Sequence, residues 1–253
     1  MLLQFLKTAK HRAGTLVRQW QLRERQYQPI LLDERALDAI RRHDYEALFA
    51  NGWAEPGERK CTDRLELLVT ELRAIAPEAR TVLDLGCANG FIDHVLAAHG
   101  YSVSGVDNDA HNRVFDHAPR PALEIARDVA RRFDLTCEFY DSDAQGFLES
   151  TDRTWDASLC LSLVHHFFVG YGFSGENRSG EEGVVRLLRL LAGRTRRVLF
   201  FESMPKVMAE HGWGDDVIRD KLASATDWNV REIGRSSERG FRERRLYALT
   251  PPA

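Results

Sequence analysis

The sequence lacks the features that stabilise small secreted domains or anchor membrane proteins. It has four cysteines in 253 residues, at positions 61, 87, 137 and 160, and no Cys-x-x-Cys pair. No stretch approaches the roughly 18 apolar residues that a transmembrane helix needs. These absences exclude a disulfide framework and a membrane span, and they give no reason to expect a metal site. They favour a reduced, cytoplasmic setting.

The sequence also lacks a strong net charge. Its 35 Lys and Arg residues nearly balance its 38 Asp and Glu residues, which leaves −3 and gives no reason to expect nucleic-acid binding. The first 25 residues carry +5, residues 231–245 carry +3 and the remainder carries −11. Arginines suit phosphate and carboxylate groups, so the basic segments could meet an anionic acceptor or surface. A solvated edge hairpin is an equal alternative for residues 231–245.

Two regions differ in their hydrophobic pattern. Residues 1–60 favour a helical N-terminal extension that ends in the turn-rich segment 51–57, and residues 61–253 form the predicted main domain. The first 25 residues interleave apolar residues with Lys and Arg. Such a segment either packs on its own domain as a cap over the ligand site, which is the more frequent role, or makes a peripheral contact with an anionic membrane surface.

From residue 62 onward, predicted helices and strands alternate. The strands are expected over residues 81–85, 102–107, 135–140, 157–161 and 197–202, and the helices over 63–76, 90–99, 121–133 and 181–191. This alternation implies βαβ crossovers, and therefore an α/β protein with a doubly wound, mostly parallel, Rossmann-like sheet. Two strands close in sequence, 228–234 and 244–249, predict an antiparallel hairpin at one edge of the sheet.

The most informative segment is the loop after the first predicted strand, in TVLDLGCANGFIDHVL (81–96). Gly86 and Gly90 let the backbone approach a ligand at the start of a helix. A dinucleotide site requires G-x-G-x-x-G for a pyrophosphate, but here Ala88 stands at the middle glycine. Asp84 would also lie poorly beside a pyrophosphate. An acidic group at this position favours a cationic ligand, such as one that carries an amino group.

Acidic residues also end the next two strands. Asp107 ends the second strand, where a carboxylate can accept hydrogen bonds from a ribose diol; the alternative is a cap or turn residue. Asp143 follows the third strand in DSDA, with Asp141 as a competing candidate. Either of these could instead be a solvated loop acid.

The segments VLDLGCANG, GVD, DSDA and WDASLCLSLVHHF resemble those of class I S-adenosylmethionine-dependent methyltransferases, over residues 62–249. The resemblance implies a seven-stranded sheet with an antiparallel last strand, S-adenosylmethionine as the cofactor and methyl transfer as the activity. By the family pattern, Asp84, Gly86, Ala88 and Gly90 surround the methionine part, Asp107 holds the ribose and Asp143 the adenine. Cys87, Asn108, Ala144 and Leu161 complete the predicted cofactor-binding set.

The acceptor is expected beyond the fourth strand, which runs into His165 and His166. In the resembled fold this strand end faces the transferable methyl group, so one histidine could act as a general base or position the acceptor. Adjacent side chains cannot both point the same way, and His165 is the preferred candidate. Glu202, at the end of the fifth strand, either assists there or forms a structural salt bridge. Residues 167–182, rich in glycine and aromatics, predict a lid or binding loop.

LSLVHHF, the loop after it and FFESMP also resemble the methyltransferase domains of bacterial O-antigen chain-terminating enzymes, over residues 81–205. This narrower resemblance implies O-methylation of a sugar, phosphate or other small-molecule or glycan acceptor. Similar features occur in methyltransferases of natural products and of RNA 5′ ends. Two alternatives stay open, an NAD(P)-dependent oxidoreductase and a non-catalytic methyltransferase-like subunit that binds a partner through its N-terminal helices.

Overall fold

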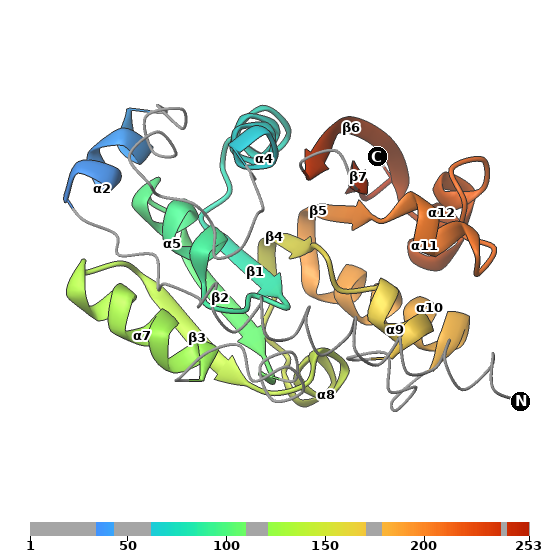
Figure 1. Cartoon of the computed structure of the whole chain (residues 1–253), viewed down its shortest axis with the longest axis horizontal. Helices are drawn as coiled ribbons and strands as arrows, with labels where there is room; N and C mark the ends of the chain where they lie inside the picture. Colours follow the sequence, from blue (N-terminus) through green and yellow to red (C-terminus); the bar gives the residue numbers. More distant parts are fainter. Residues whose placement is uncertain (1–33, 43–61, 110–120, 171–178, 239–241, 253) are drawn as a thin grey trace, which may run out of the picture.

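Seven strands form one sheet in the order β3-β2-β1-β4-β5-β7-β6 (Figure 1). The structure is a computed structural model that describes residues 34–42, 62–109, 121–170, 179–238 and 242–252. β1 to β5 run parallel, whereas β7 is antiparallel to both β5 and β6. The predicted α/β class, the mostly parallel doubly wound sheet and the antiparallel C-terminal strand are therefore confirmed.

The strands and helices alternate as the hydrophobic pattern predicts. The strands are β1 (Thr81–Leu85), β2 (Ser102–Asp107), β3 (Cys137–Asp141), β4 (Trp155–Cys160), β5 (Thr195–Ser203), β6 (Asn229–Glu238) and β7 (Arg242–Thr250). The helices are α2 (Glu34–Arg41), α4 (Thr62–Ile75), α5 (Phe91–Ala98), α7 (Ala122–Arg132), α8 (Ala144–Ser150), α9 (His165–Val169), α10 (Gly180–Arg194), α11 (Pro205–Ala209) and α12 (Ile218–Thr226).

Four helices, α8, α9, α11 and α12, have no counterpart in the sequence prediction. They are five to nine residues long, which is too short for a helical repeat of apolar residues to show. The expected lid changes at both ends: the unpredicted α9 contains Phe167 and Phe168, and the predicted helix α10 already begins at Gly180. The loop between these helices is therefore shorter than predicted, and its residues 171–178 lie outside the described part of the chain.

The two faces of the sheet are covered by different helices, because successive side chains of a strand point to opposite faces. Val82 and Phe200 belong to a buried cluster with α2, α4 and α5. Their neighbours Leu83 and Phe201 belong to a second cluster with α8 to α12. Figure 1 shows the sheet between these two groups of helices. With both faces covered, the ends of the strands are where the sheet can meet a ligand.

Of the predicted N-terminal extension, the structure describes α2. Its Leu37 and Ile40 are buried in the first cluster, and the helix packs on α5. The basic segment of the first 25 residues and the predicted boundary at residue 60 lie outside the described residues. Within the part of the chain that the structure describes, no helix is long and apolar enough to cross a membrane.

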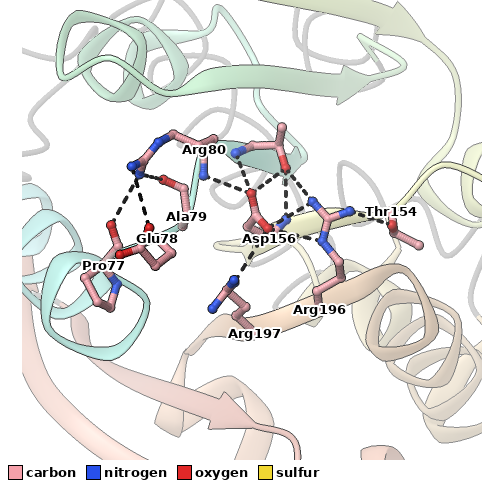
Figure 2. Close-up of polar contacts among 9 residues, drawn as sticks. Pro77, Glu78, Ala79, Arg80, Thr154, Asp156, Arg196 and Arg197 are labelled. Carbon is pink, nitrogen blue, oxygen red and sulfur yellow. Dashed lines mark hydrogen bonds and ion pairs between the residues drawn. The ribbon is translucent and has the colours of Figure 1, made fainter.

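At the amino ends of the strands, the Asp156 carboxylate ties β1, β4 and β5 together (Figure 2). Its Oδ2 accepts hydrogen bonds from the backbone N–H groups of Arg80 at 2.8 Å and Thr81 at 3.0 Å. Its Oδ1 accepts from Nε and Nη2 of Arg196 at 3.1 and 2.9 Å, and Arg197 lies 3.7 Å away. Burial alone would raise the pKa of Asp156, but these hydrogen bonds outweigh it and lower the pKa to about 2.

Replacing this carboxylate, Asp156→Asn, should lower the free energy of unfolding at neutral pH by about 2 kcal/mol, the energy that corresponds to a pKa lowered to this extent. Because the folded-state pKa lies below the ordinary value of 3.8, the stabilisation is present above that value and is lost as the pH falls towards about 2. Urea denaturation at neutral pH and near pH 3 measures both effects, and the two proteins should differ less in acid.

The matched control is Glu149→Gln, which removes an ion pair with Arg186 whose two side chains are 65% and 40% exposed. Such a surface pair contributes less than about 1 kcal/mol. Equal losses in the two variants, or a loss at Asp156 that does not shrink in acid, would contradict the role assigned to this carboxylate.

Candidate functional site

The predicted site residues meet at the carboxyl edge of the sheet, where the strand order reverses. β1 lies between β2 and β4, so the chain winds in opposite directions on its two sides. Asp84 is the penultimate residue of β1, Asp107 ends β2 and Leu161 directly follows β4. In open α/β sheets, ligands bind outside the carboxyl ends of the strands at this switch point.

The loop between β1 and α5 is held by hydrogen bonds to β2. The N–H groups of Gly86 and Cys87 donate to the carbonyl of Val106 at 2.8 and 3.2 Å. The N–H of Ala88 donates to Oδ2 of Asp107 at 3.0 Å. Ala88 has a φ of +50°, a left-handed conformation in which glycine is free of strain. The loop therefore keeps the shape of a glycine-rich loop with an alanine at this position.

Two glycines allow contacts that a side chain would block. Gly90 precedes α5 with a φ of +75°, and a Cβ atom there would lie 2.8 Å from the ring of Phe139. A Cβ atom at Gly105, in β2, would lie 2.7 Å from Oδ1 of Asp93. Real Cβ atoms do not approach other atoms this closely, so both positions depend on the absence of a side chain.

Two carboxyl groups near this loop are withdrawn from water. Asp84 is 3% exposed and Asp93, on α5, is 0% exposed. Burial raises the pKa of Asp84 to about 7, although a hydrogen bond with Asp93 and the charge of Arg64 act in the opposite direction. Burial, followed by the nearby Asp84, raises the pKa of Asp93 well above its ordinary range. A buried acidic site of this kind favours a cationic ligand.

Asp107 uses both of its carboxylate oxygens to hold the backbone. Besides Ala88, it accepts a hydrogen bond from the N–H of Asp109 at 2.6 Å. Burial raises its pKa, and the two backbone hydrogen bonds lower it in part. The predicted turn role is thus present, and since each carboxylate oxygen accepts two hydrogen bonds, the predicted ribose contact stays open. Asn108 follows it and is half-buried.

The third predicted acid, Asp143, caps the start of α8. Its Oδ1 accepts a hydrogen bond from the N–H of Gly146 at 2.8 Å, and its side chain is exposed. Ala144 is the first residue of α8 and is half-buried. The competing candidate, Asp141, ends β3 and is also exposed. Asp143 therefore has a defined capping role, and its contact with adenine stays a prediction.

The remaining cofactor candidates are uncharged. Cys87 is 6% exposed, and burial raises the pKa of its thiol, so the group stays neutral. Leu161 is buried after β4. Gly86 has a φ of +80°, and Leu163 lies within van der Waals distance of the position that its Cβ would take. Apolar side chains thus lie beside the acidic groups, where they exclude water.

His165 and His166 begin α9, and both are half-buried. Their ring centroids are 4.0 Å apart and their planes are inclined by 37°. The expectation that they cannot share a direction is wrong: adjacent helical residues are only about 100° apart, so both rings can fold to one side. Two positive charges this close would repel each other.

Glu202 lies in a buried ion cluster at the end of β5. Its side chain is 0% exposed, and its oxygens lie 2.5 Å from Arg64 and 2.7 Å from Arg244. The hydroxyl of Ser162 donates to Oε1 at 2.8 Å. Burial would raise the pKa of Glu202, but the charges of the two arginines outweigh it and lower the pKa. Of the two roles considered for Glu202, these contacts match the structural salt bridge.

Ser162 connects this cluster to the histidines. Its φ of +52° lies in a region that residues other than glycine rarely adopt. Besides donating to Glu202, its hydroxyl accepts a hydrogen bond from Nη1 of Arg244 at 3.1 Å. Ser162 stands three residues before His165, so the cluster fixes the backbone that leads into α9. Backbone strain of this kind persists only where surrounding contacts hold it.

The described arginines of the C-terminal hairpin pair with carboxylates of the protein itself. The pairs are Arg231–Glu71, Arg235–Glu232, Arg244–Glu202 and Arg245–Asp215. The side chains of Arg239 and Arg242 lie outside the described residues. These pairs favour an edge hairpin whose arginines bind carboxylates of the protein itself, over recognition of an anionic acceptor.

Three residues of the site, Asp93, Arg64 and Ser162, are absent from the sequence prediction. Asp93 is buried on α5 together with Phe91 and Val95, and an acid within an apolar helix is a signal that the sequence does offer. Arg64 and Ser162 give no local signal, because their partners are distant in sequence: Arg64 meets Glu202 across 138 positions.

The residues at the carboxyl edge fit the cofactor that the motif implies. A ligand with sulfonium and ammonium charges would be matched by the carboxyl of Asp84, beside which the carboxyl of Asp93 is buried. Among the described residues, neither oxygen of Asp93 has a hydrogen-bond donor. Asp107 offers its remaining lone pairs to a diol, and the loop that begins at Gly86 carries no bulky side chain between the strand end and α5.

Comparisons with known proteins agree with this fit. No protein-family model matches the chain. The chain is 27% identical over 161 residues to the O-antigen chain terminator bifunctional methyltransferase/kinase WbdD of Escherichia coli, which covers 61% of this chain and 20% of that protein. It is 27% identical over 142 residues to the ubiquinone biosynthesis O-methyltransferase of Alkalilimnicola ehrlichii, 52% and 53% of the two chains. The match thus spans about a fifth and about half of these curated relatives.

Solved structures show the same fold. The 2.2 Å crystal structure of WbdD matches 80% of this chain and 42% of its own, with a TM-score of 0.60 and 24% identity. Magnesium protoporphyrin IX methyltransferase (ChlM) from Synechocystis PCC 6803, with bound S-adenosylmethionine, matches 87% and 98%, with a TM-score of 0.54 and 18% identity. The relatives and the fold together support the predicted cofactor and enzyme class. In sequence and in fold, the chain resembles the class I S-adenosylmethionine-dependent methyltransferases.

Proposed function

We propose that the chain transfers the methyl group of S-adenosylmethionine to an oxygen atom of a small-molecule or glycan acceptor. The observation that carries the proposal is the pair of carboxylates, Asp84 and Asp107, at adjacent strand ends beside the switch point of this sheet. When bound, the cofactor supplies a methyl group on a sulfonium, a good leaving group that needs no metal. Transfer is in line, so the protein's main task is to hold the two reactants in position.

The cofactor side is formed by β1, β2 and the loop between β1 and α5. Asp84 would bind the cationic part of the cofactor, and Asp107 would accept hydrogen bonds from the ribose. A pyrophosphate is disfavoured here because its negative charges would meet these buried acids. The left-handed Ala88 also adds a methyl group where a dinucleotide loop has its middle glycine. These features support S-adenosylmethionine over a nicotinamide cofactor.

The acceptor side is formed by the segment after β4. An imidazole of the His165–His166 pair can take the proton of an acceptor hydroxyl. Since the described hairpin arginines already have carboxylate partners, a hydroxyl acceptor is favoured over an anionic one. The word O-methyltransferase in the name of the ubiquinone relative agrees with an oxygen acceptor.

Glu202 acts in this proposal as a positioning residue. It holds the hydroxyl of Ser162, and Ser162 sets the path of the backbone into His165 and His166. Its two arginine partners keep the Glu202 carboxylate ionised and enclose it, so that this group neither exchanges a proton nor contacts an acceptor. Its effect on the reaction therefore runs through the backbone of the segment that carries the histidines.

The acceptor can be identified by mass spectrometry. The purified chain is incubated with cofactor that carries an isotopically labelled methyl group and with pools of sugars, glycans, phosphorylated sugars and phenols. A product heavier by one labelled methyl group names the acceptor class and, after fragmentation, the acceptor atom. Label on nitrogen or carbon would contradict oxygen transfer.

The first prediction concerns the cofactor. In isothermal titration calorimetry, the chain should bind S-adenosylmethionine and not NADP, and Asp84→Asn should weaken binding at least about tenfold, because a charge-assisted contact of a buried carboxylate is lost. Glu78→Gln, an exposed change at the opposite edge of the sheet, is the control and should bind normally. Tighter binding of NADP would favour the oxidoreductase, and binding of neither would favour the non-catalytic subunit.

The second prediction concerns the histidines. Changing both, His165→Ala with His166→Ala, should lower kcat for a hydroxyl acceptor by roughly 10²- to 10⁴-fold, the usual contribution of a general base. An already anionic acceptor should be largely spared. His99→Ala, at the end of α5 remote from the site, is the control. Full turnover of a hydroxyl acceptor in the single and double variants would contradict the base assignment.

The third prediction concerns the buried cluster. Glu202→Gln leaves two buried arginines without their carboxylate and should lower the free energy of unfolding by about 3 kcal/mol. At a temperature where the variant is folded, kcat should fall while the KM for S-adenosylmethionine stays close to that of the wild type. Glu243→Gln, on an exposed residue of β7 next to Arg244, should change neither. A variant that loses stability but keeps kcat would show a purely structural role.

A further inference from the structure

Asp84 and Asp93 form a pair of buried carboxyls that a simple cofactor contact does not explain. Asp93 is 0% exposed, and neither of its oxygens has a hydrogen-bond donor among the described residues. The side chain reaches the backbone of β2 at Gly105, where a Cβ would lie 2.7 Å from its Oδ1. Gly105 is also the register partner of Asp84. The missing side chain of β2 therefore provides the space in which the two carboxyls meet.

Two ionised carboxylates cannot satisfy each other, because both are acceptors only. A hydrogen bond between Asp84 and Asp93 therefore requires that one of them carries a proton and donates. With both ionised, two like charges would also lie together out of water, which is strongly unfavourable. The burial of both carboxyls beside Gly105 thus favours at least one proton on the pair.

The groups around the pair do not supply enough positive charge to compensate two ionised carboxylates. The titratable and charged groups that face it are Arg64 of α4, Cys87 of the loop, Asp107 of β2, Cys137 of β3 and Cys160 of β4. Burial raises the pKa of each of the three thiols, so they are neutral. One cation therefore faces three carboxyls, and Arg64 already pairs with Glu202.

His94, next to Asp93 on α5, is not a proton donor to the pair. Its Nε2 lies 2.9 Å from the carbonyl of Ala126. Burial lowers its pKa to about 4, although this hydrogen bond acts in the opposite direction, so the ring is neutral at physiological pH. No other charged group of α5 is available to the pair among the described residues.

We propose that Asp93 is a neutral carboxylic acid that donates a hydrogen bond to Asp84, and that a cationic ligand binding at Asp84 expels a second proton from this pair. In the unliganded protein each carboxyl can hold a proton. On binding, the O–H bond of Asp84 breaks, its proton goes to solvent and its carboxylate faces the ligand's cation. Asp93 keeps its own proton and its hydrogen bond to Asp84. The identity of the ligand, S-adenosylmethionine, rests on the proposed function.

The pKa directions agree with this division of roles. The pKa of Asp84 is raised to about 7, so this group exchanges its proton near neutrality. The pKa of Asp93 is raised well above its ordinary range, so this group keeps its proton. Cofactor affinity should consequently rise with pH up to about neutrality and then level off.

Isothermal titration calorimetry with S-adenosylmethionine, in buffers of different ionisation enthalpy, counts the protons released. About half a proton should leave at pH 7 and nearly one at pH 6, and the dissociation constant should rise by up to about tenfold per pH unit below neutrality. S-adenosylhomocysteine, which has the ammonium without the sulfonium, should release protons as well if Asp84 faces the amino group. Binding of S-adenosylmethionine without proton release at pH 6 would overturn the proposal.

Two variants of Asp93 test its protonation state. Asp93→Asn replaces a neutral donor by another neutral donor, so the midpoint of the pH dependence should move by less than about half a pH unit. Asp93→Ala removes the donor and should raise that midpoint and weaken binding at pH 7. If Asp93 were ionised, Asp93→Asn would remove a negative charge beside Asp84 and lower the midpoint by more than about one unit, which would falsify the assignment. Thermal unfolding confirms that each variant is folded.

Carboxyl ¹³C NMR of the unliganded chain separates this inference from the proposed function. One aspartate should titrate near pH 7 and another should stay protonated above it, and the second signal should be absent in Asp93→Asn. These signals without any cofactor binding would refute the proposed function and keep the carboxyl pair. Normal cofactor binding by a protein whose aspartates are all ionised at pH 6 would keep the proposed function and refute the carboxyl pair.

Discussion

One hydrogen bond, from the N–H of Ala88 to the carboxylate of Asp107, fixes the loop on which the site is built. It joins the loop after β1 to the end of β2, and it holds Ala88 in a backbone conformation that an alanine rarely adopts. Asp84 lies two residues before this loop and is paired in register with Gly105 of β2. Two partly or fully buried acids are thereby held at adjacent strand ends, and the chemistry of the edge follows from the desolvation of their charges.

Much of the fold follows from patterns that are local in sequence. The apolar runs and their alternation with helices predict the parallel sheet, and the glycine loop with Asp84 and Asp107 predicts where a ligand lies. Short helices such as α8 and α9 are not predicted, because a helical repeat of apolar residues needs more turns than these helices have. The partners of Glu202 are not predicted for another reason. The buried ion cluster joins residues that are far apart in the chain, and in the sequence its charged residues cannot be told from surface residues.

The two sides of the site are built differently. At the proposed cofactor side, Asp84 and Asp93 are buried. On the acceptor side, charge is neutralised within the protein: Glu202 is enclosed by Arg64 and Arg244, and the hairpin arginines face carboxylates. The uneven charge of the sequence thus reflects internal pairing in the C-terminal hairpin and solvent-free acids in the loop region. The proposed acceptor side thus presents the paired rings of His165 and His166, whereas the proposed cofactor side presents acidic residues.

Two aspartates with very different pKa values lie at the two ends of β1. Asp156 holds its amino end at Thr81 and Asp84 lies near its carboxyl end, three residues and about 10 Å further along the strand. The Asp156 anchor fails only in strong acid, whereas Asp84 changes its charge near neutrality. Mild acidification therefore protonates Asp84 while Asp156 stays ionised, so the charge of Asp84 and the anchor of the scaffold are lost at different pH values.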